Sequence, residues 1–361
     1  MVLNQSNRYL STSLLKKDRQ VKKNIAGNSR SRRKGGGAGW RERTVDDMLD
    51  PPSPTSVRPR VGGTWSSAGP AIHMIWLLIA YGVLLLAIGL LDMGRAKSFD
   101  AYVLADRNRG WFLVGTSILA SVVGASATLG VADLAFRKGF PAFWWLGSGA
   151  LGLLVCGLFI ARRIREIRVC TLADLVGIMI GSPARRAVSL VIVIGWTGII
   201  AAQFTAAARI LLALAGWSYL QALAVAGAVI LAYCVLGGQL SVLKTDLLQF
   251  LLIVAGLAAA LGYLYGKTGL PPGGVRLELL NDSFGWKDFW YFQLIVGSGF
   301  IIGPDIFSRL LTSRDSATAR RSALLAGAAL LPVSAAIVAI GVWGRHFAAL
   351  PPGMSILPWI L

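Results

Sequence analysis

The chain has 361 residues, of which 55% are hydrophobic and only 15% are charged, and its formal net charge is +19. Soluble domains carry about 25% charged residues, so this composition excludes an ordinary water-soluble enzyme. The 3 Cys and 2 His residues argue against a disulfide scaffold and against a metal site built from histidine. We find no nucleophile–base pair and no phosphate-binding loop, and we expect a protein that is not an enzyme and has no cofactor.

Residues 1–70 form a basic region with 14 Lys and Arg against 5 Asp and Glu, broken by the run Gly35–Gly37 and by prolines. This composition cannot bury a core, so we expect a disordered tail. Three explanations remain open. The start codon is misassigned and the natural start lies near Met74, or the tail is inert, or it is an arm that binds nucleic acid or anionic lipid.

From residue 71 to residue 361 the sequence is a series of long apolar runs. A helix needs about 20 mostly apolar residues to cross a bilayer, and only helices satisfy every backbone group there at this length. Eight runs without charge have suitable lengths: 71–91, 111–132, 140–161, 187–208, 217–236, 247–266, 289–304 and 322–344. We predict an all-α integral membrane domain with about eight complete spans, and a ninth that begins at Ser355.

The basic residues between the runs predict the orientation. Alternate connections carry 15 Lys and Arg on one side, in 92–110, at Lys244, in 162–186 and in 305–321, against 7 on the other. The richer side should be cytoplasmic, which puts the N-terminus outside and favours the misassigned start over a basic tail that crosses the membrane. We expect a multi-pass protein of the plasma (inner) membrane. Because most of the charge outside the tail reports topology, no nucleic-acid partner is expected.

Two of the runs carry small and polar residues where a plain anchor would need only aliphatic ones. The second run contains Gly124, and the seventh contains Gly297, Ser298 and Gly299. Glycine inside a helix costs about 1 kcal/mol relative to alanine. Such residues serve either close packing of helices or a break that exposes backbone carbonyls. Because interrupted helices at corresponding positions of two halves are typical of transporters with inverted repeats, we predict helix breaks here.

Two polar residues in the spans are candidate functional groups. Asp246 begins the sixth run, where it is either a partner of the helix dipole or a station for a cation on the cytoplasmic side. Gln203 lies within the fourth run, where it either bonds to another helix or faces a solute. The sequence alone does not separate these alternatives.

Five segments, taken in order, resemble the sodium:solute symporter family, which includes the sodium/proline and sodium/glucose cotransporters. The segments are Ser98–Ala105 with Arg107 and Gly110–Phe112; Ser117–Gly130; Thr171–Asp174; Leu236–Gly238 with Thr245, Asp246 and Gln249; and Gly303–Asp305 with Arg309, Arg320 and Arg321. Each segment alone is weakly specific, but together they stay in register over about residues 72–361.

The resemblance implies a fold of two inverted five-helix repeats preceded by one extra helix, and inward transport of a small solute coupled to sodium. It assigns sodium binding to the carbonyls of Ala120 and Val123, and the sodium exit route to Asp246. It assigns the solute cavity to Ile199, Ile200 and Phe300, to which we add Gln203 for its chemistry. No metal other than sodium, the coupling ion, is implied.

Two departures from the family pattern matter. Some relatives carry a carboxylate or an amide where this chain has Val122 and Ala127, so no solute can be carried over from them. In the family, hydroxyls of the eighth core helix complete the sodium site, and that helix corresponds to the run that stops at Leu361. With the second repeat incomplete, we expect a fragment or a truncated gene product that is inactive alone.

The sequence therefore predicts a sodium-coupled symporter of a small organic solute, whose partners are sodium, the solute and the lipid bilayer. An alternative is a transporter-like membrane sensory module of a signalling protein, because similar domains occur fused to kinases. A third interpretation is a membrane remnant that no longer transports.

Overall fold

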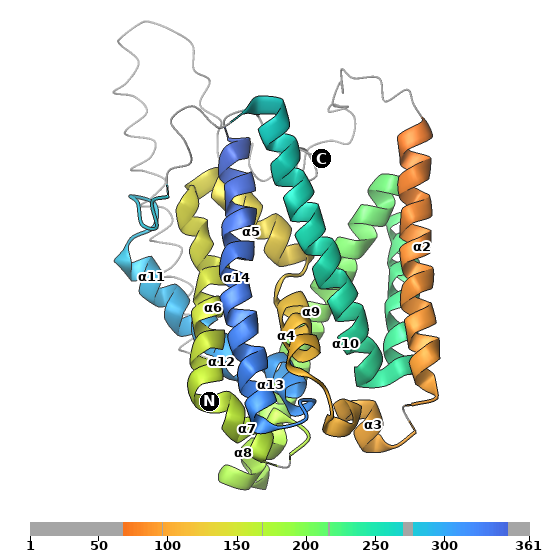
Figure 1. Ribbon diagram of the computed structural model, residues 1–361, viewed down its shortest axis with the longest axis vertical. Helices are drawn as coiled ribbons and strands as arrows, with labels where there is room; N and C mark the ends of the chain where they lie inside the picture. Colours follow the sequence, from red (N-terminus) through yellow and green to blue (C-terminus); the bar gives the residue numbers. More distant parts are fainter. Residues whose placement is uncertain (1–67, 96, 168, 216, 270–276, 346–361) are drawn as a thin grey trace, which may run out of the picture. The chain divides into compact units, whose positions relative to one another are not determined.

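The computed structural model describes residues 68–345, with gaps at 96, 168, 216 and 270–276. The predicted tail therefore lies outside the described residues, except for its last three, which begin the first helix. The helices are α2 (Ala68–Met93), α3 (Phe99–Leu104), α4 (Trp111–Val122), α5 (Ala125–Lys138), α6 (Trp144–Val155), α7 (Ala161–Glu166), α8 (Leu172–Met179), α9 (Ser182–Ala215), α10 (Tyr219–Thr268), α11 (Trp286–Phe292), α12 (Ser298–Ile302), α13 (Pro304–Leu311) and α14 (Ser316–Gly344) (Figure 1). Within these residues there is no β-strand, only two isolated bridges.

Six helices in the described part of the chain are long and apolar enough to cross a membrane, or up to seven if a bent pair counts as one span. The bent pair is α4 with α5, which the sequence reads as the single run 111–132, and its two halves meet at an angle of 54°. The predicted runs 217–236 and 247–266 fall in one element, α10, which has 50 residues. A straight helix of that length would measure about 75 Å, more than twice the hydrocarbon thickness of a bilayer.

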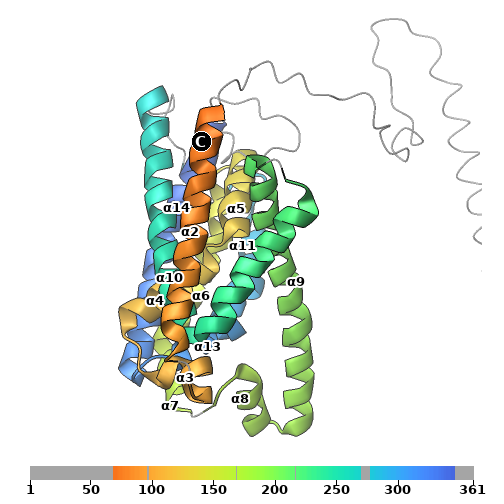
Figure 2. The ribbon, with the colours of Figure 1, turned by 90° about the vertical axis from the view of Figure 1, so that its right-hand side faces the viewer.

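Gly238 resolves this conflict, because it divides α10 into two arms. Its φ of 58° and ψ of −158° lie outside the helical region, and Figures 1 and 2 show α10 folding back on itself. A side chain is strained at this φ, and a Cβ on Gly238 would lie 2.7 Å from the carbonyl oxygen of Tyr102. The Gly237–Gly238 pair thus allows both the reversal and the close approach of α3.

The core lies where α4, α5 and α6 pack around α14. Half of the most apolar window of α14 is buried, whereas none of the corresponding window of α9 is. Large apolar side chains are exposed along α9 and α2, among them Leu190, Val191 and Leu91. An apolar surface this extensive suits contact with lipid and would be unfavourable in water.

The connections with the most arginine and lysine gather at one end of the helices. This end, which carries α3, α7, α8 and α13, is called the α3 end below (Figures 1 and 2). It includes the connections between residues 92 and 110, 162 and 186, and 305 and 321. The sequence predicts that these three connections share one side of the membrane, and in the structure they lie together at the α3 end.

Candidate functional site

Three side chains from three helices form a buried hydrogen-bonded network near the α3 end. Ser117 of α4 donates its hydroxyl to Oδ2 of Asp246 in α10. Arg309 of α13 donates Nε to the Ser117 Oγ at 2.9 Å and Nη2 to the same Asp246 oxygen at 3.1 Å. The Arg309 and Asp246 side chains are 13% and 10% exposed. The ion pair and the hydrogen bond offset the cost of removing the ionised carboxylate from water, so Asp246 can be buried in its charged form.

The position of Asp246 within α10 bears on one of the two alternatives left open by the sequence, its role as a partner of the helix dipole. The second arm of α10 begins at the Gly238 break, eight residues before Asp246. The effect of a helix dipole falls off within the first turn, so a carboxylate two turns inside the helix gains little from it. The interpretation of Asp246 as the first residue of a helix is therefore wrong, and its partners are Ser117 and Arg309 instead.

The chain interruption at Gly303 and Pro304 brings Arg309 to this position. Gly303 has φ −57° and ψ 141°, and Pro304 occupies the first turn of α13. Proline disfavours the helical conformation of the residue before it but suits the first turn of a new helix. The new helix points Arg309 toward α4 and α10, and Nη1 of Arg309 also bonds to the Asp305 carbonyl at 3.3 Å.

The predicted breaks at Gly297, Ser298 and Gly299 are displaced in the structure. Gly297 and Ser298 have helical dihedral angles; Gly297 ends a π-helical turn over Gln293–Gly297, and Ser298 follows it. A Cβ on Gly152 of α6 would overlap the Gly297 carbonyl oxygen. Gly297 therefore lies where the backbones of α6 and this segment approach closely, which is the packing alternative, whereas Gly299 has open space around it. The interruption follows at Gly303, before Pro304.

The interruption between α4 and α5 falls at Val123 and Gly124. Val123 has φ −93° and ψ 58°, and Gly124 is extended with ψ −179°. Ala120 lies in the last turn of α4, where carbonyls lack partners within the helix. Ala120 and Val123 are 7% and 0% exposed. The two residues assigned to sodium binding thus lie at an interior break of the helix, and that role stays a prediction.

Gln203 of α9 reaches this same break. A Cβ on Gly124 would lie 3.0 Å from the Gln203 Nε2, so glycine at this position makes room for the amide. Ile199 and Ile200 lie one helical turn from Gln203 but are each 50% exposed. Phe300 of α12 packs against Gly149 of α6. The structure therefore brings Gln203 to the break, and places the three apolar residues of the predicted solute cavity on two different elements.

The network lies below the break along α4, on the side of the α3 end. Ser117 is three residues before Ala120 and six before Val123, which corresponds to about 4.5 and 9 Å along a helix axis. A cation that left carbonyls at the break toward the α3 end would therefore meet the Asp246 carboxylate within one or two helical turns.

Ser117 and Arg309 belong to the motifs that resemble the family, but the sequence predicts no role for Ser117 and explains Arg309 only as a charge of the positive-inside rule. A second charge counted in this way, Lys244, donates to Oδ1 of Asp92 at 2.6 Å. Arg95 also donates to this oxygen, at 3.0 Å, and the Asp92 side chain is fully buried. Lys244 lies two residues before Asp246, and its bond to Asp92 connects the end of α2 to α10.

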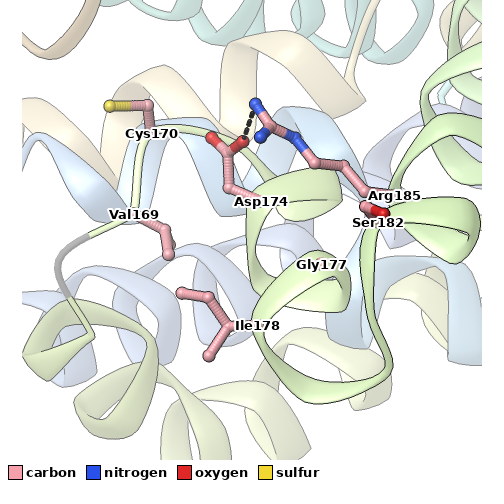
Figure 3. A pocket seen from close by; sticks show the side chains of 7 residues that line it. All are labelled: Val169, Cys170, Asp174, Gly177, Ile178, Ser182 and Arg185. Atoms are coloured by element: carbon pink, nitrogen blue, oxygen red, sulfur yellow. Dashed lines mark ion pairs between the residues drawn. The ribbon is translucent and has the colours of Figure 1, made fainter.

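The segment Thr171–Asp174, which has the sequence Thr-Leu-Ala-Asp, has a local structural role at the start of α8. The Thr171 hydroxyl accepts from the Asp174 backbone N–H, and Asp174 accepts from the Thr171 N–H, which forms a capping box. Asp174 also pairs with Arg185 at 2.7 Å, across a surface cavity of about 400 Å³ between α8 and α9 (Figure 3). Figure 3 shows the two side chains pointing toward each other, so each of the two charges is paired within the protein.

Comparisons with known proteins identify the class of molecule. A solved structure described as the substrate-bound outward-open state of a Na⁺-coupled sialic acid symporter superposes with a TM-score of 0.68 at 14% identity, covering 78% of this chain and 63% of that one. The predicted all-α fold of a membrane transporter with inverted five-helix repeats is therefore confirmed. The chain is a multi-pass integral membrane protein.

Residues 102–275 match the model of the sodium:solute symporter family. The chain is 24% identical over 318 residues to the sodium/pantothenate symporter of Escherichia coli (strain K12), which covers 80% of this chain and 62% of that protein. It is 28% identical over 202 residues to sodium/glucose cotransporter 2 of Rattus norvegicus, which covers 54% of this chain and 30% of that protein. The resemblance predicted from the motifs is thus matched by the family model over residues 102–275 and by these sodium-coupled relatives.

Proposed function

We propose that this chain forms the core of a sodium-coupled symporter of a small organic solute, and that sodium leaves it past Asp246. One observation carries this proposal. A buried carboxylate held by Ser117 and Arg309 lies within two turns of the interior break at Gly124, toward the end of the molecule that is rich in arginine. The proteins it resembles are sodium-coupled symporters, which supports a transporter rather than an enzyme.

The topology belongs to the same proposal. The positive-inside rule favours a cytoplasmic α3 end in the plasma membrane, with the N-terminus of α2 outside. Sodium would then enter from the opposite end, bind at the break with the help of the Ala120 and Val123 carbonyls, and exit by way of Asp246. Gln203, whose amide lies at the break, would contact the solute or sodium. The chain spans 62% of the length of the E. coli relative, so transport by the complete protein is part of the proposal.

Sodium binding gives the first test, because it does not require the solute to be known. The purified chain is heated in detergent with increasing NaCl, choline chloride holding the ionic strength constant, and unfolding is followed by tryptophan fluorescence. We expect sodium, but not potassium, to raise the unfolding midpoint in the wild type. Asp246→Asn should weaken this response, whereas Asp106→Asn, a 54% exposed carboxylate at the same end, should leave it unchanged.

Transport by the complete protein is tested in proteoliposomes with a panel of organic acids, amino acids and sugars under an inward sodium gradient. Asp246→Asn should weaken the dependence on sodium more than it lowers the maximal uptake. Equal sodium activation in the variant and the wild type would remove Asp246 from the exit route. Sodium binding without uptake of any solute would favour the sensory module over the symporter.

A further inference from the structure

A second cavity at the α3 end has a lining unlike that of the first. It lies between α7 and the beginning of α14, elements that contact each other, and has a volume of about 290 Å³. Its lining consists of Arg162, Ala317, Arg320, Arg321 and Leu324. Three of the five lining residues are arginines and none of the five is acidic.

These arginines lack the partners that neighbouring arginines have. In the described part of the chain, none of the three takes part in an ion pair, and the Arg320 Nε is buried without a hydrogen-bond partner. Arg165, from the same α7, instead donates Nε to the Ser313 carbonyl. Arg162 and Arg321 are exposed, whereas the Arg320 Nε is buried. A buried donor without an acceptor is unfavourable, so this atom favours an acceptor that comes from outside the chain.

The chemistry of the lining selects the kind of acceptor. A guanidinium presents a planar fork of donors that matches the oxygens of a phosphate group, and several forks around one cavity match a single anion with several oxygens. Leu324 lies one turn farther along α14 than Arg320 and Arg321, toward the middle of the span, and adds an apolar wall. A headgroup at the arginines would thus leave room for hydrocarbon beside Leu324.

We propose that the cavity between α7 and α14 binds a phosphate group, supplied either by the headgroup of an anionic lipid or by free phosphate. The observations that carry it are the cavity itself, its three arginines without acidic partners, and the buried Nε of Arg320. The proposal does not depend on the transport function, since none of these residues belongs to the network around Asp246.

The test measures the unfolding midpoint of the full chain, purified in a neutral detergent, with three probes. These are dioctanoyl phosphatidylglycerol, dioctanoyl phosphatidylcholine and inorganic phosphate at constant ionic strength. We expect the anionic lipid to raise the midpoint in a saturable way and the zwitterionic lipid not to do so. Arg320→Gln and Arg321→Gln should each weaken the apparent affinity about fivefold, the contribution of one basic residue near an anionic surface.

Two further variants keep the test specific. Arg163→Gln removes an exposed arginine of α7 that does not line the cavity, and it should bind like the wild type. Ala317→Trp fills the cavity and keeps all three arginines, and it should lose the response even if an arginine variant fails to fold. A response to phosphatidylglycerol alone identifies a lipid site, and a response to inorganic phosphate as well identifies a site for free phosphate. No response in the wild type, or an equal response in Ala317→Trp, would overturn the proposal.

Discussion

Replacing Arg309 by methionine isolates the electrostatic part of the buried network. The change removes the charge and keeps an unbranched side chain, so it leaves the Asp246 carboxylate 10% exposed without its cation. Two charges whose centres are about 4 Å apart attract each other by about 4 kcal/mol at an effective dielectric constant of 20. This value agrees with the loss of about 3–5 kcal/mol observed when one partner of a buried pair is removed.

The expected result is a large destabilisation that a second substitution reverses. Asp246→Asn combined with Arg309→Met removes both charges, and asparagine can still accept the hydrogen bond from Ser117. The double variant should therefore recover most of the lost stability. The matched control is Arg314→Met, whose guanidinium is 59% exposed and pairs with an exposed carboxylate, so it should cost less than about 1 kcal/mol.

Unfolding free energies from SDS titration of the protein in mixed micelles provide the comparison. The helical content and the elution volume of each variant establish that it is folded before the titration. If the double variant were no more stable than Arg309→Met, the loss would come from packing rather than from an uncompensated carboxylate. A cost as small as that of Arg314→Met would show that water reaches Asp246, and would refute the reasoning from burial.

Three further changes follow from other contacts and are checked by thermal unfolding in detergent. Gly238→Ala should lower the midpoint because of the positive φ and the nearby carbonyl, whereas Gly262→Ala, with open space around it in the same helix, should stabilise by about 0.5–1 kcal/mol. Lys244→Met should cost more than Asp92→Asn, because it leaves a fully buried carboxylate with only the 67% exposed Arg95 as its cation, while the lysine is 36% exposed and can turn to water. Asp315→Ala should cost about 1 kcal/mol at pH 7 by removing the cap of α14. The bond from the backbone N–H of Thr318 lowers the pKa of Asp315 below the ordinary 3.8, so this cost should be present above that pH and disappear as the pH falls through the lowered value.

The apolar runs predicted where helices lie because lipid leaves the backbone few alternatives. They could not show that Gly238 joins two of the runs into one element, since a glycine pair reads equally as a flexible loop. They also misplaced the interruption near Gly297, because glycine signals both packing and breaking. Only the approach of α6 in space separates these two uses, and sequence spacing does not contain it.

The candidate site was predictable only in part, for a related reason. Asp246 is recognisable in the sequence as a carboxylate next to an apolar run, and Gln203 is recognisable as an amide within one. Arg309 is not recognisable in this way, because the positive-inside rule already explains a cation just beyond a span. Its pairing with a residue 63 positions earlier depends on how α13 leaves the break at Gly303. The same holds for Ser117, one small residue among several in a run, which lies 129 positions from its acceptor.

The three residues of the network share a feature that links the site to movement. Each follows or precedes a non-helical glycine by fewer than nine residues: Ser117 lies seven before Gly124, Asp246 eight after Gly238, and Arg309 six after Gly303. The buried network therefore connects segments that adjoin three of the non-helical glycines.

Because the network joins α4, α10 and α13, a movement of one of these helices affects the other two. A change in the angle between α4 and α5 would shift Ser117 relative to Asp246, and would weaken the bonds that also hold Arg309. Conversely, loss of the Asp246 charge would release α13 and α4 together. A cation that enters the break and then reaches Asp246 competes with Arg309 for the same oxygen, and so has different affinities for the joined and the separated arrangement. Such a difference in affinity is what allows a ligand to shift an equilibrium between two conformations. If sodium leaves past Asp246, as proposed above, this network would link its passage to opening of the α3 end.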